Sequence, residues 1–135
     1  MSKWVKARFD ASWAVGCEWC LSRDPVSCFI AVERTPNPDP SDLPYHAFQE
    51  KILGFACYDV AAKGMFGAMG VDEAYQERGI GRALLLSCLH AMKAERYAYA
   101  VIGWAGEPDF YTRCAGATPI EDSTPSFWES ELWVE

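Results

Sequence analysis

Val-Asp-Glu-Ala-Tyr-Gln-Glu-Arg-Gly-Ile-Gly-Arg-Ala-Leu-Leu-Leu, residues 71–86, is the stretch that decides the fold. An apolar, strand-like run from Met65 to Val71 leads into it, and a long helical pattern leads out. Two glycines, Gly79 and Gly81, stand at this passage from strand to helix. Because glycine has no Cβ, a ligand can approach the main chain closely there. The first N–H groups of the helix have no partner inside it and lie at the positive end of the helix dipole, which suits a phosphate group.

The side chains of this turn add positive charge to that backbone. Arg78 and Arg82 stand at its two ends, and only Glu77 opposes them. The simpler interpretation is a plain helix start with permissive glycines. A dinucleotide-binding fingerprint fits less well, because Leu84 stands where its third glycine should be.

The row Gln-x-x-Gly-x-Gly, formed here by Gln76, Gly79 and Gly81, resembles the acyl-CoA pyrophosphate loop of the GNAT N-acetyltransferase superfamily. Val71 at the end of the strand and Tyr75 just before the loop resemble that family too. The resemblance implies that backbone amides of the loop hold the pyrophosphate of coenzyme A. It therefore implies cofactor contacts at Gln76, Glu77, Arg78, Gly79, Ile80, Gly81 and Arg82.

The strand before the loop also matches the family. The resemblance implies that this strand and the next one splay apart, and that the pantetheine arm of the coenzyme pairs with exposed amides at Met69, Gly70 and Val71. From the residues alone, Gly67 and Gly70 inside a strand indicate a bulge, or the close approach of another backbone or a ligand.

Phe110-Tyr111, in a short predicted helix, resembles the family's Phe-Tyr-x-x-x-Gly element. The resemblance implies that Tyr111 lies near the coenzyme sulfur and is the general acid. A phenol within hydrogen-bond reach can protonate a leaving thiolate of pKa near ~8.5. The chain departs from the pattern by one residue, since Gly116 follows Tyr111 by five positions rather than four. Without the loop upstream, two ordinary core aromatics would be the better interpretation.

We assign no general base. The family often uses a glutamate on the strand before the loop, and Met65–Val71 contains no carboxylate. Asp59, Glu107 and Asp109 are the substitutes to consider, and each of them is equally well explained as a surface carboxylate. The resemblance also implies that a backbone N–H on the splayed strand, at Gly70 or Val71, stabilises the oxyanion that forms when the amine attacks the thioester.

Length and composition narrow the classes of protein. The 135 residues suit one domain with a single core, covering residues 1–135. A net charge of −7 argues against a general binder of nucleic acid or of anionic membranes, and mildly favours cationic amines. The N-terminus lacks an apolar signal core, and no apolar run approaches the ~20 residues that a membrane helix needs. We therefore expect a cytoplasmic protein with reduced thiols.

Most of the six cysteines sit in apolar runs, as buried thiols do. Cys17 and Cys20 have the spacing of a redox pair, but they fall inside a helical pattern rather than after a strand. Only His46 and His90 could join a metal site, and no second cysteine pair exists. Core packing is therefore favoured over redox or zinc chemistry, and we expect no metal.

The remaining pattern predicts an α/β (α+β) fold of the GNAT type, with a mixed, mostly antiparallel central sheet flanked by helices and shortened at both termini. We expect helices at residues 10–22 (capped by Asp10 or Ser12), Gly79–Arg96 and from Pro108 to a stop at Gly116. We expect strands at Val26–Val32, Ile52–Val60, Met65–Val71 and Tyr97–Gly103, and a last short one at Ala117–Ile120. The prolines within Thr35–Pro44 predict an exposed loop.

These features predict an N-acetyltransferase that moves an acetyl group from acetyl-CoA to a primary amine of a small molecule or peptide by direct attack. The alternative is a non-catalytic acyl-CoA-binding or protein-interaction module with the same fold, favoured by the missing strand carboxylate and the short termini. A shortened sheet leaves an unpaired edge. We hypothesise a homodimer that covers this edge with the apolar tail, Phe127, Trp128, Leu132, Trp133 and Val134.

Overall fold

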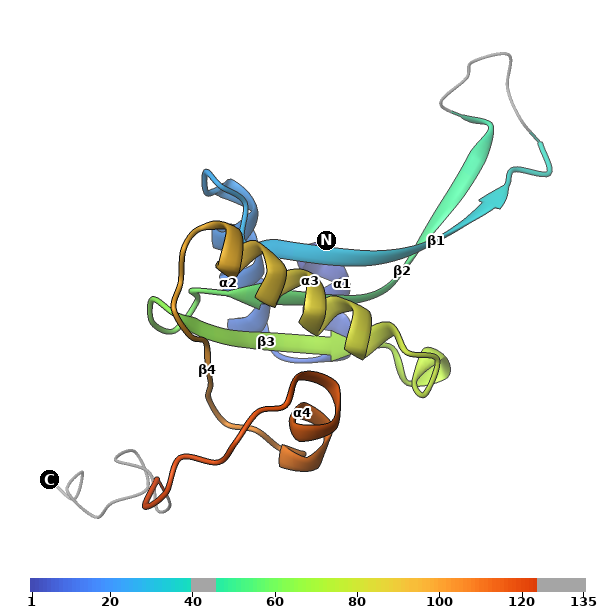
Figure 1. Cartoon of the computed structure of the whole chain (residues 1–135). Coiled ribbons are helices and arrows are strands. Elements are labelled where there is room, and N and C mark those ends of the chain that lie inside the picture. The colour runs from blue at the N-terminus through green and yellow to red at the C-terminus, as the bar shows by residue number, and fades with distance from the viewer. Residues whose placement is uncertain (40–45, 124–135) are drawn as a thin grey trace, which may run out of the picture. The chain divides into compact units, whose positions relative to one another are not determined.

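The computed structural model describes residues 1–39 and 46–123, which fall into two compact units, Met1–Trp104 and a second that begins at Ala105. The helices and strands are drawn in Figure 1. In the first unit the order is α1 (Ser2–Arg8), α2 (Ala11–Ser22), β1 (Cys28–Pro36), β2 (Phe48–Tyr58), β3 (Met65–Val71), the 3₁₀ turn η2 (Glu73–Tyr75), α3 (Ile80–Ala94) and β4 (Val101–Ile102). The second unit contains α4 (Pro108–Ala115).

The strands form one sheet in chain order, β1-β2-β3-β4. β1 pairs with β2 and β2 with β3 in antiparallel fashion, whereas β3 and β4 are parallel. The predicted fold class, a mixed and mostly antiparallel sheet flanked by helices, is confirmed.

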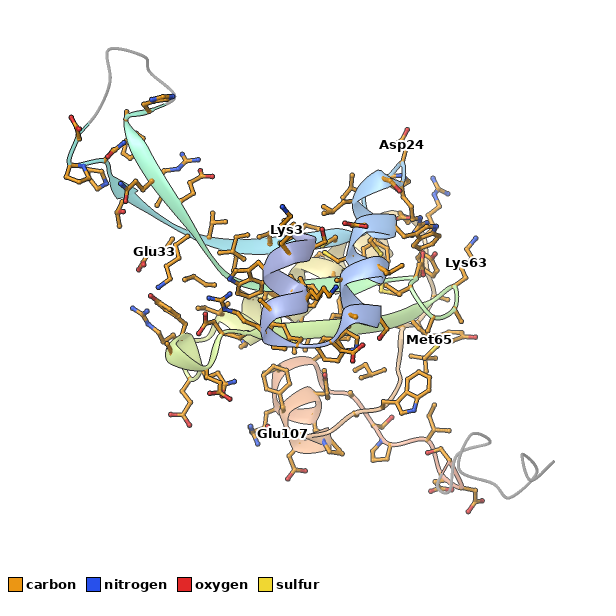
Figure 2. All side chains as sticks on the ribbon, turned by 180° about the vertical axis from the view of Figure 1, so that it is seen from behind. Lys3, Asp24, Glu33, Lys63, Met65 and Glu107 are labelled. Atoms are coloured by element: carbon orange, nitrogen blue, oxygen red, sulfur yellow. The ribbon has the colours of Figure 1, made fainter. Side chains whose placement is uncertain are left out.

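β2 is the strand on which the core is built, because helices cover both of its faces. The two opposite views of Figures 1 and 2 place α3 over one face of the sheet, and α1 with α2 over the other. Phe55 is completely buried and packs with Val5 on the α1 and α2 side. The hydroxyl of Tyr58 donates a hydrogen bond to Glu95, just beyond α3. Burying a side chain such as Phe55 contributes about 1.5–3 kcal/mol to stability.

α3 presents one apolar stripe to the sheet. Its buried residues are Leu84, Leu85, Cys88 and Met92, which recur at helical spacing. His90 is exposed on this helix.

The first predicted helix is confirmed as α2, and Asp10 is the residue that caps it. The Asp10 carboxylate accepts a hydrogen bond from the Ser12 amide at 2.7 Å. The seven-residue helix α1, which precedes it, was not predicted. Only Val5 of α1 is buried, so its sequence shows no apolar stripe.

Two strand boundaries were predicted wrongly in the proline-rich region. β1 continues through Pro36, into the loop predicted for Thr35–Pro44, and β2 begins at Phe48 rather than at the predicted Ile52. The two strands hold each other there, and the Asn37 amide donates to the Ala47 carbonyl at 2.9 Å just beyond them. β1 lies at the edge of the sheet, where proline is tolerated in a strand. Residues 40–45 of this segment lie outside the described residues.

Two further strand predictions are wrong. The strand predicted at 97–103 is reduced to the two-residue β4. Tyr97 does not join it, because its amide donates to the Met92 carbonyl and its hydroxyl donates to Asp59. Residues 117–120 form no strand. The helix before them ends as predicted, at Gly116 with φ of 65°. The predicted apolar tail lies outside the described residues.

The prediction that most cysteines are buried is confirmed, and all six are free thiols in this structure. Five are buried and Cys114 is half-buried. Over residues 1–39 and 46–123, no helix is both long and apolar enough to cross a membrane.

Candidate functional site

β3 is interrupted by a bulge at Gly67 and Ala68. Ala56 pairs with Met69 and Tyr58 with Phe66, so two residues of β3 lie opposite one residue of β2. Gly67 has a φ of 127°, a backbone conformation that residues with a side chain rarely adopt. The predicted bulge is therefore confirmed at Gly67.

The two last strands part at this bulge. β4 pairs with β3 at Met65 and Phe66, and within the described part of the chain no strand continues along that edge of β3. The opposite edge of β3 is occupied, because Met69, Gly70 and Val71 pair with β2. The second half of β3 therefore has one edge where main-chain groups can pair with an extended ligand.

Gly70 allows an aromatic ring to lie against β3. A Cβ at this position would lie 2.5 Å from the ring of Phe9, too close for any side chain. Phe9 in turn stacks on Trp13 and meets Phe55 edge-on, with ring centroids 5.7 and 5.8 Å apart. Close approach at Gly70 was predicted, but the group that approaches this face is a side chain rather than a backbone or a ligand.

Asp72 fixes the turn that follows β3. Its amide donates to the Leu53 carbonyl at 2.8 Å, and its carboxylate accepts hydrogen bonds from Arg8 at 2.8 Å and from the Ala74 amide at 3.1 Å. The Arg8 guanidinium, followed by the Ala74 amide, lowers the pKa of Asp72 below its ordinary value. The turn therefore begins from an anchored position.

The loop between this turn and α3 is open to solvent, with residues 76–79 all exposed. The Gln76 side chain donates to the Val71 carbonyl at 3.4 Å, which ties the loop to the end of β3. Both Glu77 and Gly79 have left-handed backbones, with φ of 62° and 79°. A Cβ on Gly79 would meet no atom within 4 Å, so the space beside it is open.

The start of α3 has no side-chain cap. Its first helical hydrogen bond runs from the Ala83 amide to the Gly79 carbonyl, at 3.0 Å. The amides of Ile80, Gly81 and Arg82 come before that bond, at the positive end of a 15-residue helix. Uncapped amides on an exposed turn are a suitable site for a phosphate group.

Two cations surround Tyr75 beside this loop. Lys51 Nζ donates to the Tyr75 hydroxyl at 2.6 Å and lies 4.6 Å from the ring centroid. Arg78 Cζ lies 5.3 Å from the same centroid. Sequence reasoning missed Lys51, which is 24 positions from Tyr75 and reaches it only because β2 passes next to the end of β3.

A family model described as an acetyltransferase (GNAT) domain matches residues 40–114, more than half of the chain. The chain belongs to the GNAT family. No curated protein and no solved structure gives a significant match. Membership confirms the predicted resemblance and supports acetyltransferase activity in general, and the matched range contains β3, the loop, α3 and most of α4.

The structure brings ten residues that the GNAT resemblance singled out into two consecutive pieces of the first unit. Met69–Val71 form the end of β3, and residues 76–82 form the loop and the first residues of α3. Tyr111, the eleventh, belongs to α4 in the second unit. Burial first, and the charge of Glu107 second, raise the pKa of Tyr111 above its ordinary value. A phenol of ordinary pKa, about 10, is already protonated at neutral pH, and this shift keeps Tyr111 in that form.

Asp59, one of the three carboxylates considered as a general base, is fully engaged. It accepts hydrogen bonds from the Gly64 amide at 2.7 Å, from Arg23 at 3.3 Å and from the Tyr97 hydroxyl. Burial favours its neutral form, but these three partners outweigh burial and hold the pKa of Asp59 below its ordinary value. A buried carboxylate of lowered pKa is a poor base, so Asp59 has a structural role at the turn between β2 and β3.

Proposed function

We propose that this GNAT protein transfers the acetyl group of acetyl-CoA to a primary amine of a small molecule or peptide. The observation that supports the proposal best is the exposed and uncapped start of α3, directly after a strand with one unpaired edge. Membership in an acetyltransferase family supports assigning both features to the binding of one ligand, acetyl-CoA. The net charge of −7 mildly favours a cationic acceptor.

In this proposal the coenzyme pyrophosphate binds the backbone amides of residues 76–82, the loop Gln76-Glu77-Arg78-Gly79-Ile80-Gly81-Arg82. An anion at a helix N-terminus gains about 0.3–1 kcal/mol from the dipole, and up to about 2 kcal/mol when partly buried. Lys51 and Arg78 attract the phosphates from the side of Tyr75. The pantetheine arm then pairs with the unpaired edge of β3 at Met69, Gly70 and Val71.

The proposed chemistry is direct attack. The amine nitrogen forms a bond to the thioester carbonyl carbon, the Val71 amide on the unpaired edge of β3 stabilises the oxyanion, and the carbon–sulfur bond breaks. Val71 is the residue for this role because Asp72 donates its amide to Leu53 on β2, and N–H directions alternate along a strand. Tyr111 gives its proton to the departing thiolate. The amine must also lose a proton, and with Asp59 engaged, the candidates that remain for this base are Glu107 and Asp109 beside Tyr111 in the sequence.

The test is turnover of acetyl-CoA across a panel of primary amines, for the wild type and for Tyr111→Phe. We expect turnover by the wild type, and a fall in kcat of about 100-fold in the variant with little change in coenzyme affinity, because only proton transfer is lost. Tyr99→Phe is the matched control, since Tyr99 is 76 % exposed. Equal kcat for wild type and Tyr111→Phe would remove Tyr111 from the mechanism.

A non-catalytic acyl-CoA-binding module is the second candidate. It is favoured by the absence of a carboxylate on β3 and by the engagement of Asp59. Coenzyme binding without turnover of any amine would support this candidate over the enzyme.

Assembly and cellular location stay predictions. β1 is the outer strand of the sheet, and a homodimer that covers its edge should appear in light scattering as twice the chain mass. A monomer mass at high concentration would rule the dimer out. The cytoplasmic assignment rests on the sequence, in which the N-terminus lacks an apolar signal core, and the free thiols are compatible with it.

A further inference from the structure

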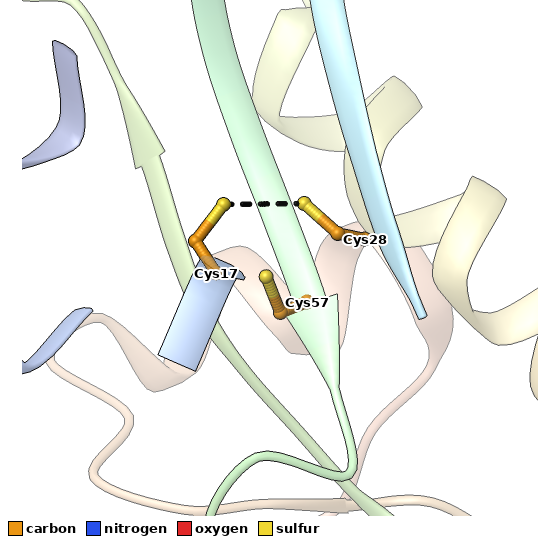
Figure 3. Close-up of side chains that lie close together, drawn as sticks. All are labelled: Cys17, Cys28 and Cys57. Carbon is orange, nitrogen blue, oxygen red and sulfur yellow. Dashed lines mark hydrogen bonds between the residues drawn. The ribbon is translucent and has the colours of Figure 1, made fainter. Parts of the chain in front are cut away.

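Three cysteines from three different elements meet in the core of the first unit. Cys17 lies on α2, Cys28 at the start of β1 and Cys57 near the end of β2. Their sulfur atoms all lie within 4.8 Å of one another, and those of Cys17 and Cys28 are 3.5 Å apart. Figure 3 shows the three side chains converging on a common space.

Strand pairing and helix packing create this cluster. Cys28 and Cys57 are direct cross-strand partners in the β1–β2 ladder, so both side chains project to the same face of the sheet. α2 covers that face and brings Cys17 to them. All three are 1–7 % exposed, among apolar residues such as Val5 and Phe55.

The spacing suits three sulfurs bound to one ion. A thiolate–metal bond of about 2.3 Å places three ligands around one centre about 4 Å apart. The Cys17 and Cys28 sulfurs are 3.5 Å apart, and no pair among the three exceeds 4.8 Å, which is compatible with that value. A disulfide requires about 2.05 Å between two sulfurs and would leave the third thiol unused. Three sulfurs with one shared centre therefore favour a metal over a disulfide.

We propose that Cys17, Cys28 and Cys57 form a binding site for a soft metal ion with a filled d shell, Zn²⁺ or Cu⁺. Soft thiolate ligands select these ions over Mg²⁺, Ca²⁺ and Mn²⁺. Each thiol loses its proton on binding, and the ion offsets part of the buried negative charge that results: two charges for Zn²⁺ and one for Cu⁺. The site ties α2 to β1 and β2, and it is independent of the proposed acetyl transfer.

Cys20 distinguishes the two ions. It lies one helical turn from Cys17 and is fully buried, with its sulfur 3.5 Å from the Tyr58 carbonyl oxygen. Structural Zn²⁺ sites are almost always tetrahedral, so Zn²⁺ would recruit Cys20 as the fourth ligand. Cu⁺ would be held by the three clustered sulfurs without it.

The experiment uses the full chain, purified with a reductant and a chelator and then freed of the chelator. Zn²⁺ and, without oxygen, Cu⁺ are titrated in competition with a chromophoric chelator, both on the folded chain and during refolding. We expect one ion per chain for at least one metal, and Cys57→Ser to weaken binding by at least about 10-fold, because a hydroxyl is a poor soft ligand. Cys88→Ser should leave affinity unchanged, since Cys88 is equally buried but lies on α3 outside the cluster.

A second measurement covers the case in which Cys57→Ser does not fold. Co²⁺ added to the wild-type chain should give a thiolate-to-metal absorption band in the near ultraviolet, and Zn²⁺ should abolish it. Failure to take up either ion, before or after refolding, overturns the proposal. So does an equal loss of affinity in Cys88→Ser. Treatment with glutathione disulfide that removes two hydrogen atoms from the chain mass, without any ion uptake, would show a disulfide pair and would overturn it too.

Discussion

Replacing Gly79 with alanine tests the proposed phosphate loop by adding one methyl group. Gly79 caps α3 with a φ of 79°, where a residue with a Cβ is strained by about 1–2 kcal/mol. A Cβ there would meet no atom within 4 Å, so no steric clash adds to that cost. The methyl group would occupy the open space beside the first amides of α3, which is the proposed position of the pyrophosphate.

We therefore expect Gly79→Ala to lower the free energy of unfolding by about 1–2 kcal/mol and to remain folded at 25 °C. Coenzyme A affinity, measured by isothermal titration calorimetry, should fall by at least about 10-fold, equivalent to about 1.4 kcal/mol, because the methyl group displaces the ligand.

Gly64→Ala is the matched control for backbone strain. Gly64 lies in the turn between β2 and β3 with a φ of 84°, and a Cβ there would make only ordinary contacts, 3.8 Å from Tyr97. It should lose similar stability and keep its affinity for coenzyme A. If Gly79→Ala binds coenzyme A as tightly as Gly64→Ala does, the loop amides do not hold the pyrophosphate.

Three further predictions follow from the first unit. Gly70→Ala should cost about 1–3 kcal/mol of stability, measured by urea unfolding, because the new Cβ would collide with the Phe9 ring; Phe9→Leu in the same chain should recover part of it. The pKa of Asp59 is lowered on folding, so its stabilising contribution is present above the unfolded-state value of 3.8 and is lost as the pH falls through the lower folded-state pKa. Thermal unfolding between pH 2 and 7 should thus depend less on pH in Asp59→Asn than in the wild type. Lys51→Ala should weaken coenzyme A binding by about 2- to 5-fold and reduce its salt dependence, since an exposed cation near the proposed phosphate site is removed.

Each of these predictions has a control in the same chain. Gly106→Ala should leave stability unchanged, because a Cβ there meets nothing within 4 Å; an equal loss at both glycines would remove the Phe9 explanation. Asp24 is exposed, and Asp24→Asn should keep the wild-type pH profile; a profile altered as much as that of Asp59→Asn would contradict the role of Asp59. Lys63→Ala removes an exposed cation that lies over Tyr97, and a loss of affinity equal to that of Lys51→Ala would show only a general charge effect.

Local sequence patterns carried enough information for the central part of the fold. β3 begins and ends where the apolar, strand-like run predicts, and α3 begins one residue after Gly79 because that glycine adopts the left-handed cap. The bulge at Gly67 could also be predicted, because a glycine inside a strand often marks a bulge. The candidate site residues 69–71 and 76–82 could be proposed because the GNAT motif that they resemble is contiguous in the sequence.

Features that depend on tertiary contacts could not be predicted. Lys51 meets Tyr75, and Cys28 meets Cys57, only through strand register, which leaves no signal at short range in the sequence. The pattern at 97–103 has the alternation of a strand, yet the Tyr97 side chain is held by Asp59, and only two residues pair with β3. The tertiary contact between Tyr97 and Asp59 therefore outweighed the local strand propensity of this segment.

The most direct test of the central claim is a titration of the ¹⁵N-labelled full chain with coenzyme A, followed through the backbone amide signals in NMR spectra. The predicted result is saturable shifts that are largest at the amides of residues 69–71 and 76–82. Inorganic pyrophosphate alone should shift only the second group, because it lacks the pantetheine arm. Shifts centred elsewhere, or no shift at Gly79, Ile80 and Gly81 when the ligand saturates, would contradict the claim that the start of α3 binds the coenzyme.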